Sequence, residues 1–128
     1  NSLVVGTENN GIYFSKNNGI SWTKCNSEIQ QNTFYAITYD KNNPNIIYAG
    51  GFKTGILKST DAGITWKEYH KGLDCLDIQS IAVAPGDSSI VFAGTLGKGI
   101  YKSTDSGQTW KSVGLDGSLI SKILVENF

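Results

Sequence analysis

The sequence predicts an all-β fold made of the four-stranded antiparallel blades of a β-propeller. An eight-residue phrase begins at Ser15, Ser59 and Ser103, so that it recurs every 44 residues. A fixed period of this length is typical of propeller blades and solenoid units. Four short strand patterns fall in each period and no segment shows helical periodicity. About three blades' worth of strands, circularly shifted along the chain, are therefore expected as part of a larger or oligomerically completed propeller.

The second and third strands of each blade precede the repeated phrase. They are rich in β-branched and aromatic residues and are bounded by glycine, which is typical of short strands. The second strands are expected at residues 3–7, 47–51 and 91–95, and the third strands at residues 11–14, 55–58 and 99–102.

The outermost strand begins at the tryptophan that ends each phrase, and the innermost strand of the next blade follows after a loop. Outer strands are expected at residues 22–24, 66–69 and 110–113, and inner strands at residues 34–39, 78–83 and 120–125. The chain is thus a single propeller segment with repeat units at about 1–33, 34–77 and 78–119 and a final inner strand at 120–128.

Both ends of this arrangement are expected to be exposed sheet edges. Pairing them within one chain would close a ring of three blades, whereas propellers normally have four to eight. Two alternatives remain open. The chain is a fragment of a longer propeller, beginning at an internal residue since it contains no methionine, or two chains exchange end strands and close six blades.

The repeated phrase is expected to close the turn between the third and outermost strands. Asp61 and Asp105 stand where a carboxylate can accept backbone N–H groups of its own turn, and Gly63 and Gly107 can supply a positive φ. Hydroxyl groups add hydrogen bonds and tryptophan buries a large apolar surface. The structural residues are Ser15, Asn17, Gly19, Trp22, Ser59, Asp61, Gly63, Thr65, Trp66, Ser103, Asp105, Gly107, Thr109 and Trp110.

These residues resemble the Asp-box, the S-x-D-x-G-x-T-W motif of the bacterial neuraminidase repeat (BNR). It occurs in sialidases, sortilin-type receptors, xyloglucanases and photosystem II assembly factors. The resemblance implies a structural motif on the side of the ring opposite the ligand face. Asn17 and Ser21 replace aspartate and threonine in the first copy, so its turn should be held more weakly.

Composition excludes several kinds of partner. Eleven lysines balance eleven acidic residues, so neither nucleic acid nor a membrane surface is an expected partner, and no run is apolar enough to insert into a bilayer. Cys25 and Cys75 have no metal-ligand spacing, and a disulfide between them stays open. No metal or cofactor is expected. Only the family resemblance favours an extracytoplasmic or secreted location.

The enzymatic alternatives are few. Sialidases grip their substrate carboxylate with arginine, whose planar fork lysine cannot copy, and this chain has no arginine. Asp74 and Asp77 are the best candidates for the two carboxyl groups of a glycosidase, although two aspartates in a polar loop are usually solvated. His70 has no readable nucleophile partner. The alternative function is therefore part of a xyloglucanase-type glycoside hydrolase.

We expect a non-enzymatic scaffold or binding module for a protein or carbohydrate, completed by other blades or a second copy. Propeller geometry places ligands in the loops between second and third strands and in the links between blades. The ligand-face candidates are Glu8, Phe52, Lys53, His70, Asp74, Asp77, Leu96, Lys98 and Asp116. Phe52 and Leu96 are possible contact anchors.

Overall fold

Residues 2–25 and 32–126 are described by the computed structural model of the chain. They form three antiparallel sheets with the strand orders β1-β2-β3, β4-β5-β6-β7 and β8-β9-β10-β11. These residues contain no helix that is long and apolar enough to cross a membrane. The predicted all-β propeller fold is confirmed.

Each sheet is one blade. Blade 1 contains β1 (Leu3–Gly6), β2 (Ile12–Ser15) and β3 (Thr23–Lys24); blade 2 contains β4 (Phe34–Asp40), β5 (Asn43–Gly51), β6 (Ile56–Ser59) and β7 (Lys67–Glu68); blade 3 contains β8 (Ile78–Val83), β9 (Val91–Thr95), β10 (Ile100–Ser103) and β11 (Lys111–Gly114).

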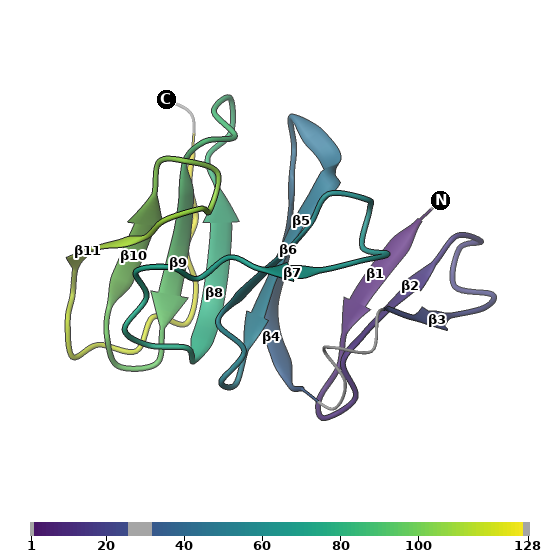
Figure 1. Cartoon of the computed structure of the whole chain (residues 1–128), viewed down its shortest axis with the longest axis horizontal. Coiled ribbons are helices and arrows are strands. Elements are labelled where there is room, and N and C mark those ends of the chain that lie inside the picture. Colours follow the sequence, from purple (N-terminus) through teal and green to yellow (C-terminus); the bar gives the residue numbers. More distant parts are fainter. Residues whose placement is uncertain (1, 26–31, 127–128) are drawn as a thin grey trace.

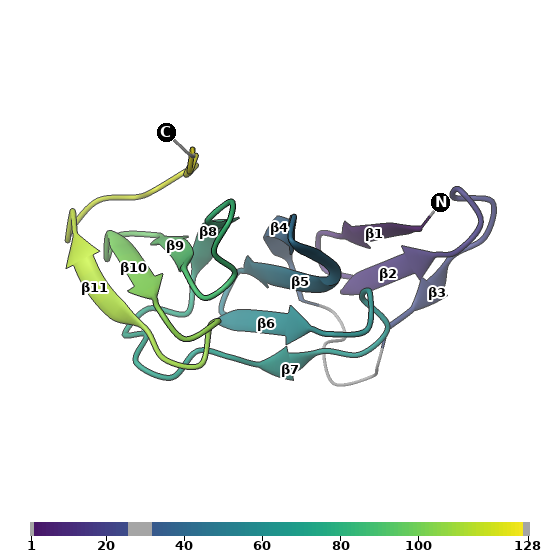
Figure 2. The same cartoon turned by 90° about the horizontal axis from the view of Figure 1, so that it is seen from above.

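The three blades lie side by side in an arc, with β1, β4 and β8 on its concave side and β3, β7 and β11 on its convex side (Figure 2). Because neighbouring strands are antiparallel, their connections gather at two opposite edges (Figure 1). The Asp-box edge holds the repeated phrases. The loop edge holds the connections β1–β2, β5–β6 and β9–β10 and the links between blades.

The hydrophobic core lies between blades and not within them. One cluster joins Ile12 and Cys25 of blade 1 to residues of blade 2 that include Trp66, and a second joins Tyr48 and Ile56 of blade 2 to blade 3. Each blade therefore buries its apolar face only when a neighbour packs on it.

Glycine near the end of each second strand makes room for this contact. A Cβ on Gly6 would lie 2.7 Å from Phe34 Cβ, and a Cβ on Gly50 would lie 2.6 Å from Ile78 Cγ2. Since real Cβ atoms do not approach so closely, the first residue of the following inner strand could not pack over a larger side chain. The glycines that end the predicted strands thus serve the contact between blades.

The predicted inner strand at residues 120–125 begins correctly but is not a strand. Ile120 donates its N–H to the Thr95 carbonyl (2.9 Å) and packs over Gly94, as Phe34 does over Gly6. Residues 121–126 pair with no strand of the described chain. A strand needs a neighbour for its backbone hydrogen bonds, and none lies beside this segment. Residues 127–128 of the prediction lie outside the described residues.

Candidate functional site

The Asp-box turn of blade 3 is a closed network of hydrogen bonds. Ser103 Oγ accepts the Gly107 N–H (2.8 Å) and donates to Asp105 Oδ1 (2.8 Å). Asp105 Oδ1 also accepts the Thr109 N–H (2.8 Å), and its Oδ2 accepts the Thr109 hydroxyl. Hydrogen bonds from Thr109 and Ser103 lower the pKa of Asp105 to about 2. Asp105 thus accepts hydrogen bonds from the backbone and the side chains of its own turn.

The other two turns repeat this geometry. Asp61 Oδ1 accepts the Thr65 N–H (2.9 Å), and although burial raises the pKa of Asp61, hydrogen bonds from Thr65 and Ser59 lower it below its ordinary value. In blade 1, Asn17 Oδ1 accepts the Ser21 N–H (3.0 Å). The first turn therefore keeps the pattern without the charge.

The tryptophans bind neighbouring blades together. Trp66 and Trp110 are each 3% exposed, and Trp110 Nε1 donates to the Tyr69 carbonyl of the preceding blade (2.7 Å). Trp22 is 42% exposed. Trp22 differs from the other two tryptophans because no described blade packs against the outer side of blade 1. The motif also joins blades and does not only close its own hairpin.

A lysine that sequence reasoning missed completes the junction between blades 2 and 3. Lys58 Nζ donates to the Ser106 carbonyl (2.8 Å) and lies 5.3 Å and 5.0 Å from the ring centroids of Tyr48 and Tyr69. Burial lowers the pKa of Lys58. Ser106 has a φ of 59°, and Asn18 and Ala62 at the same place in the other turns have φ values of 60° and 62°. The Asp-box edge thus provides contacts that hold neighbouring blades together.

The loop edge carries the predicted ligand-face residues. Phe52 is 49% exposed and Leu96 is 42% exposed, and Lys53 Nζ lies 5.0 Å from the Phe52 ring centroid. Glu8, Lys53, Asp74, Lys98 and Asp116 are exposed, whereas His70 and Asp77 are half-buried.

The two aspartates considered for catalysis have different surroundings. Asp77 Oδ1 accepts the Lys53 N–H (2.9 Å), and its backbone carbonyl accepts the Leu96 N–H (3.0 Å). Asp77 therefore holds the β5–β6 loop and the β9–β10 loop in place by hydrogen bonds. Burial and the nearby charge of Asp74 raise the pKa of the Tyr101 hydroxyl. A catalytic role for either aspartate stays a prediction.

His70 packs as part of its blade. A Cβ on Gly55 would lie 2.3 Å from His70 Nδ1, so the imidazole lies directly over that glycine. Nδ1 is buried without a hydrogen-bond partner among the described residues, and Nε2 lies 3.7 Å from Glu68 Oε2. The ring fills space beneath the β5–β6 loop.

Two leucines at the loop edge extend the predicted anchors. Leu76 is 40% exposed and Leu119 is 53% exposed. The Leu76 carbonyl accepts the Gly55 N–H (2.9 Å), and Leu119 pairs with Leu96 in a β-bridge. We call Phe52, Leu76, Leu96 and Leu119 the loop-edge row. Sequence reasoning missed the two link residues, although Leu76 directly precedes the aspartate that it did single out.

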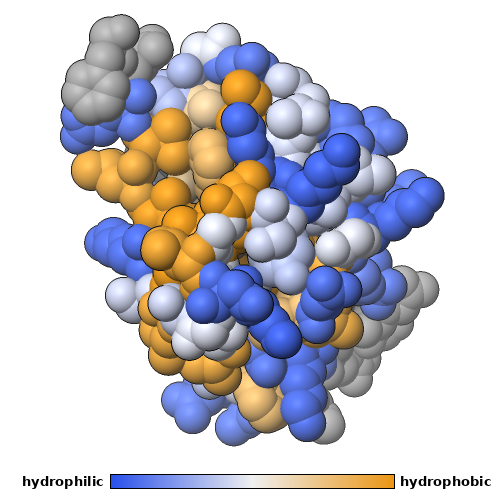
Figure 3. Space-filling model, turned by 90° about the vertical axis from the view of Figure 1, so that its left-hand side faces the viewer, coloured by the Kyte–Doolittle hydropathy of each residue, from blue (hydrophilic) through white to orange (hydrophobic). Residues whose placement is uncertain are grey.

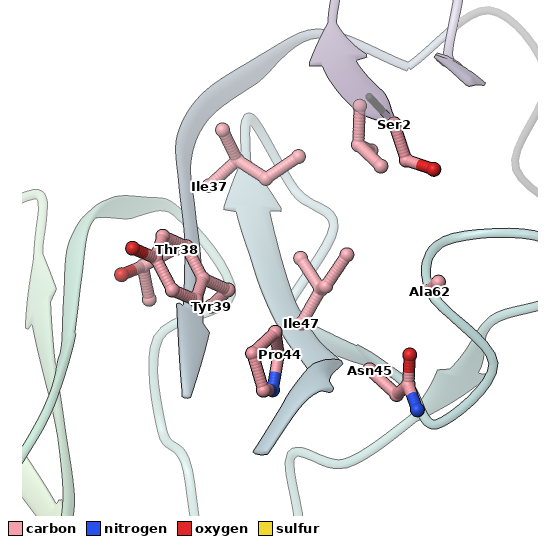
Figure 4. Close-up of a pocket in the computed structure, with 9 residues that line it drawn as sticks. Ser2, Ile37, Thr38, Tyr39, Pro44, Asn45, Ile47 and Ala62 are labelled. Atoms are coloured by element: carbon pink, nitrogen blue, oxygen red, sulfur yellow. The ribbon is translucent and has the colours of Figure 1, made fainter. Parts of the chain in front are cut away.

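A groove of about 520 Å³ lies elsewhere, between β1 and the inner strands of blade 2 (Figure 4). It is lined by Ser2, Val4, Ile37, Thr38, Tyr39, Pro44, Asn45, Ile47 and Ala62.

Within residues 2–25 and 32–126 no three His, Cys, Asp or Glu side chains gather as metal ligands. Cys25 and Cys75 are free thiols, and burial raises the pKa of Cys25.

Comparison with known proteins agrees with this geometry. The model of the BNR/Asp-box repeat matches residues 13–24 and 57–68. No curated protein matches the sequence. Among solved structures, an ancestral GH74 enzyme is 22% identical with a TM-score of 0.73 over 92% of this chain. The GH74 enzyme of Niastella koreensis is 24% identical with a TM-score of 0.70 over 87% of this chain.

A structure described as YCF48 bound to D1 peptide is 21% identical, with a TM-score of 0.60 over 84% of this chain. The chain spans 17% of the ancestral GH74 enzyme, 19% of the Niastella enzyme and 35% of YCF48. Because these identities are below 25%, the similarity establishes the fold alone. This chain is a β-propeller segment that carries BNR/Asp-box repeats.

Proposed function

We propose that this chain is a non-enzymatic binding module whose loop edge holds a peptide segment of a protein partner. The observation that carries the proposal is the loop-edge row, four large apolar side chains that are 40% to 53% exposed. They lie on loops and links at one edge of two neighbouring blades. Apolar side chains gathered on a surface mark interaction sites.

The backbone beneath the row is fixed before any ligand arrives. Asp77 accepts N–H groups from both Lys53 and Leu96, and the Leu76 carbonyl accepts the Gly55 N–H. Anchors presented on a braced backbone lose little conformational entropy on binding. The site therefore suits a ligand that is short or conformationally restricted, because such a ligand also loses little conformational entropy on binding.

Charge narrows the ligand class. Lys53 follows Phe52 and Lys98 lies two residues after Leu96, so blades 2 and 3 each present an apolar side chain with an exposed ammonium group nearby. An extended peptide that combines apolar and acidic side chains matches both. The YCF48 structure, described as bound to D1 peptide, supports a peptide ligand on this fold. Tryptophan, which would stack well on a sugar ring, lies at the opposite edge.

The test begins with selection of peptides from a random library on the immobilised chain. The selected peptides should combine apolar and acidic residues. Fluorescence anisotropy titrations should show that Phe52→Ala and Leu96→Ala each weaken binding by about tenfold or more, the scale of a contact anchor. Ile20→Ala and Lys41→Ala are controls, because both residues are exposed at the Asp-box edge. Equal losses in the controls would remove the loop edge as the binding site.

A second candidate is part of a xyloglucanase-type glycoside hydrolase. It is supported by the GH74 xyloglucanase of Xanthomonas campestris, 14% identical with a TM-score of 0.68, and by two aspartates at the loop edge. Xyloglucan hydrolysis, followed as released reducing ends, should be absent from the chain. Hydrolysis that Asp74→Asn or Asp77→Asn abolishes would replace the binding-module proposal with this one.

A further inference from the structure

A β-bulge lies near the start of β4, the inner strand of blade 2. Phe34 and Ala36 pair with consecutive residues of β5, although they are two residues apart in β4, and Tyr35 between them has no partner on β5. Phe34 belongs to the cluster that joins blades 1 and 2, whereas Ala36 packs against the cluster that joins blades 2 and 3. In a regular strand, residues two apart point to the same face. Tyr35 is therefore the extra residue of the bulge and belongs to neither packed face.

The inner strand of blade 3 has the same bulge. Ile78 and Ser80 pair with consecutive residues of β9, and Gln79 between them has no partner on β9. Ile78 belongs to the cluster between blades 2 and 3, whereas Ser80 Oγ donates to the carbonyl of Ile120, which follows blade 3 in the chain (3.2 Å). Gln79 is thus the extra residue here. Bulges re-aim single side chains and are frequent next to active sites.

Both extra residues lie at the concave side of the arc. β4 and β8 are end strands of their sheets, and they line the concave side in Figure 2. Because the extra residue points toward neither neighbouring blade, its side chain extends from the free edge of the strand. Tyr35 is 55% exposed and Gln79 is half-buried. The bulges thus present a phenol and an amide to the space inside the arc.

The same backbone hydrogen bond places each extra residue near a member of the loop-edge row. Phe52 donates its N–H to the Thr33 carbonyl (2.9 Å), and Leu96 donates its N–H to the Asp77 carbonyl (3.0 Å). The extra residue follows each of these acceptors by two positions, which is about 7 Å along an extended strand. Blades 2 and 3 therefore each combine an exposed apolar side chain on a loop with a polar side chain on the adjoining inner strand.

The open faces at the two ends of the arc are different. Val113 and Leu115 are 52% and 61% exposed, and hydrophobic residues gather on the β11 side of the molecule (Figure 3). In this fold neighbouring blades cover such apolar faces, as blades 2 and 3 cover each other's. Gln79 lies on β8, which contacts β4 on one side and Ile120 on the other. Its accessible part is therefore not the result of an absent neighbour.

We propose that Tyr35 and Gln79 hydrogen-bond the backbone of the peptide held by the loop-edge row, an inference that rests on the proposed function and adds the polar contacts of that site. A bound peptide loses water from its N–H and C=O groups, and each group left unpaired costs free energy. The apolar side chains of the row offer no partner. A phenol hydroxyl and a primary amide can each donate and accept, so they suit peptide groups of any sequence.

This arrangement gives the ligand a direction. The peptide runs from blade 2 to blade 3 along the concave rim of the loop edge, with apolar side chains on Phe52 and Leu96 and with backbone groups on Tyr35 and Gln79. The row selects side chains, and the two extra residues hold the main chain in an extended form.

The test uses a peptide selected on the immobilised chain and fluorescence anisotropy titrations. Tyr35→Phe and Gln79→Met remove the hydroxyl and the amide while keeping side chains of similar size. Each should weaken binding about three- to tenfold, the scale of a single hydrogen bond. Tyr39→Phe and Gln108→Met are matched controls and should leave binding unchanged. Tyr39 is an exposed tyrosine of β4 that lines the groove beside blade 1, and Gln108 is exposed at the Asp-box edge.

Two results separate this inference from the proposed function. If Phe52→Ala weakens binding while Tyr35→Phe and Gln79→Met leave it unchanged, the loop edge binds the peptide without these side chains and the inference is wrong. If none of the three variants weakens binding, the loop edge is not the site and both proposals fail.

A second measurement tests for direct contact. Peptides are made in which one backbone amide at a time is replaced by an ester, which removes an N–H donor and weakens the carbonyl acceptor. For one of these peptides Tyr35→Phe should cause no further loss of affinity, because the partner of the hydroxyl is already gone. If Tyr35→Phe causes the same loss with every peptide, the hydroxyl acts on the fold and does not contact the ligand.

Discussion

The junction between blades 2 and 3 is closed, whereas the junction between blades 1 and 2 is only partly closed. In the first, Ile81 is 9% exposed and Trp110 is 3% exposed. In the second, Trp66 is equally buried, but Ile37 is 39% exposed beside the groove. The two junctions have equivalent residues and differ in one element, because β1 has no inner strand beside it among the described residues.

The comparison shows which part of a blade each neighbour covers. The Asp-box tryptophan is covered by the preceding blade, so Trp66 is buried even where the inner strand is missing. The inner-strand residues are covered by the preceding inner strand, so Ile37 is not. Whether a residue is buried in this fold therefore depends on the neighbouring blade. Substitutions at equivalent positions can thus change the free energy of unfolding by very different amounts.

The largest expected effect contrasts two tryptophans. Trp110→Ala should lower the free energy of unfolding by about 3–5 kcal/mol, the usual loss for a buried tryptophan. Trp22→Ala should cost less than about 1 kcal/mol, because its ring is 42% exposed. Urea unfolding at low chain concentration measures both. Equal losses would contradict the conclusion that the preceding blade covers this side chain.

A smaller difference is expected between two isoleucines. Ile81→Ala should cost about 2–4 kcal/mol, as for other buried isoleucines, whereas Ile37→Ala should cost about 1 kcal/mol or less. The same urea measurement compares them. If Ile37→Ala proves as costly as Ile81→Ala, the groove is closed in solution and the contrast between the junctions fails.

The smallest effect concerns the charge of the Asp-box. The folded pKa of Asp105 is about 2, below its ordinary 3.8. A depressed carboxyl pKa contributes stability above the unfolded pKa, and this contribution is lost as pH falls from 3.8 to about 2. Asp105→Asn should therefore reduce the loss of stability over this window. Asn17→Asp should add a similar loss, and midpoints of urea unfolding at each pH give the readout.

If neither Asp105→Asn nor Asn17→Asp changes how stability depends on pH, the carboxylate of this motif stabilises the fold no more than an asparagine does. Asn17 already makes the same hydrogen bond to the backbone that Asp105 makes. The pH profile is therefore the measurement that separates charge from geometry.

Much of the fold follows from the spacing of the repeated phrase. The period places a strand before and after every copy, and the strands that begin at Phe34 and Ile78 lie at the predicted position in their blades. The aspartate and glycine of the turn were also predictable, because their hydrogen-bond partners lie within four residues in the chain. Local hydrogen bonds need only local sequence.

The candidate site was predicted only in part. Phe52 and Leu96 were identified because an apolar side chain at a loop tip can be a contact anchor. Leu76 and Leu119 were missed, since their places beside those loops depend on contacts with the neighbouring blade. The bracing role of Asp77 was missed for the same reason.

The sequence by itself determined the all-β class, the 44-residue blade and the turn chemistry of the Asp-box, because these depend on strand periodicity and on hydrogen bonds between near neighbours. Only the tertiary structure decided that Trp22 is exposed while Trp66 and Trp110 are buried, and that residues 121–126 form no strand. Equivalent residues have similar local sequences in the three copies. Their burial and pairing depend on whether a neighbouring blade is present, and that is a property of the assembled arc.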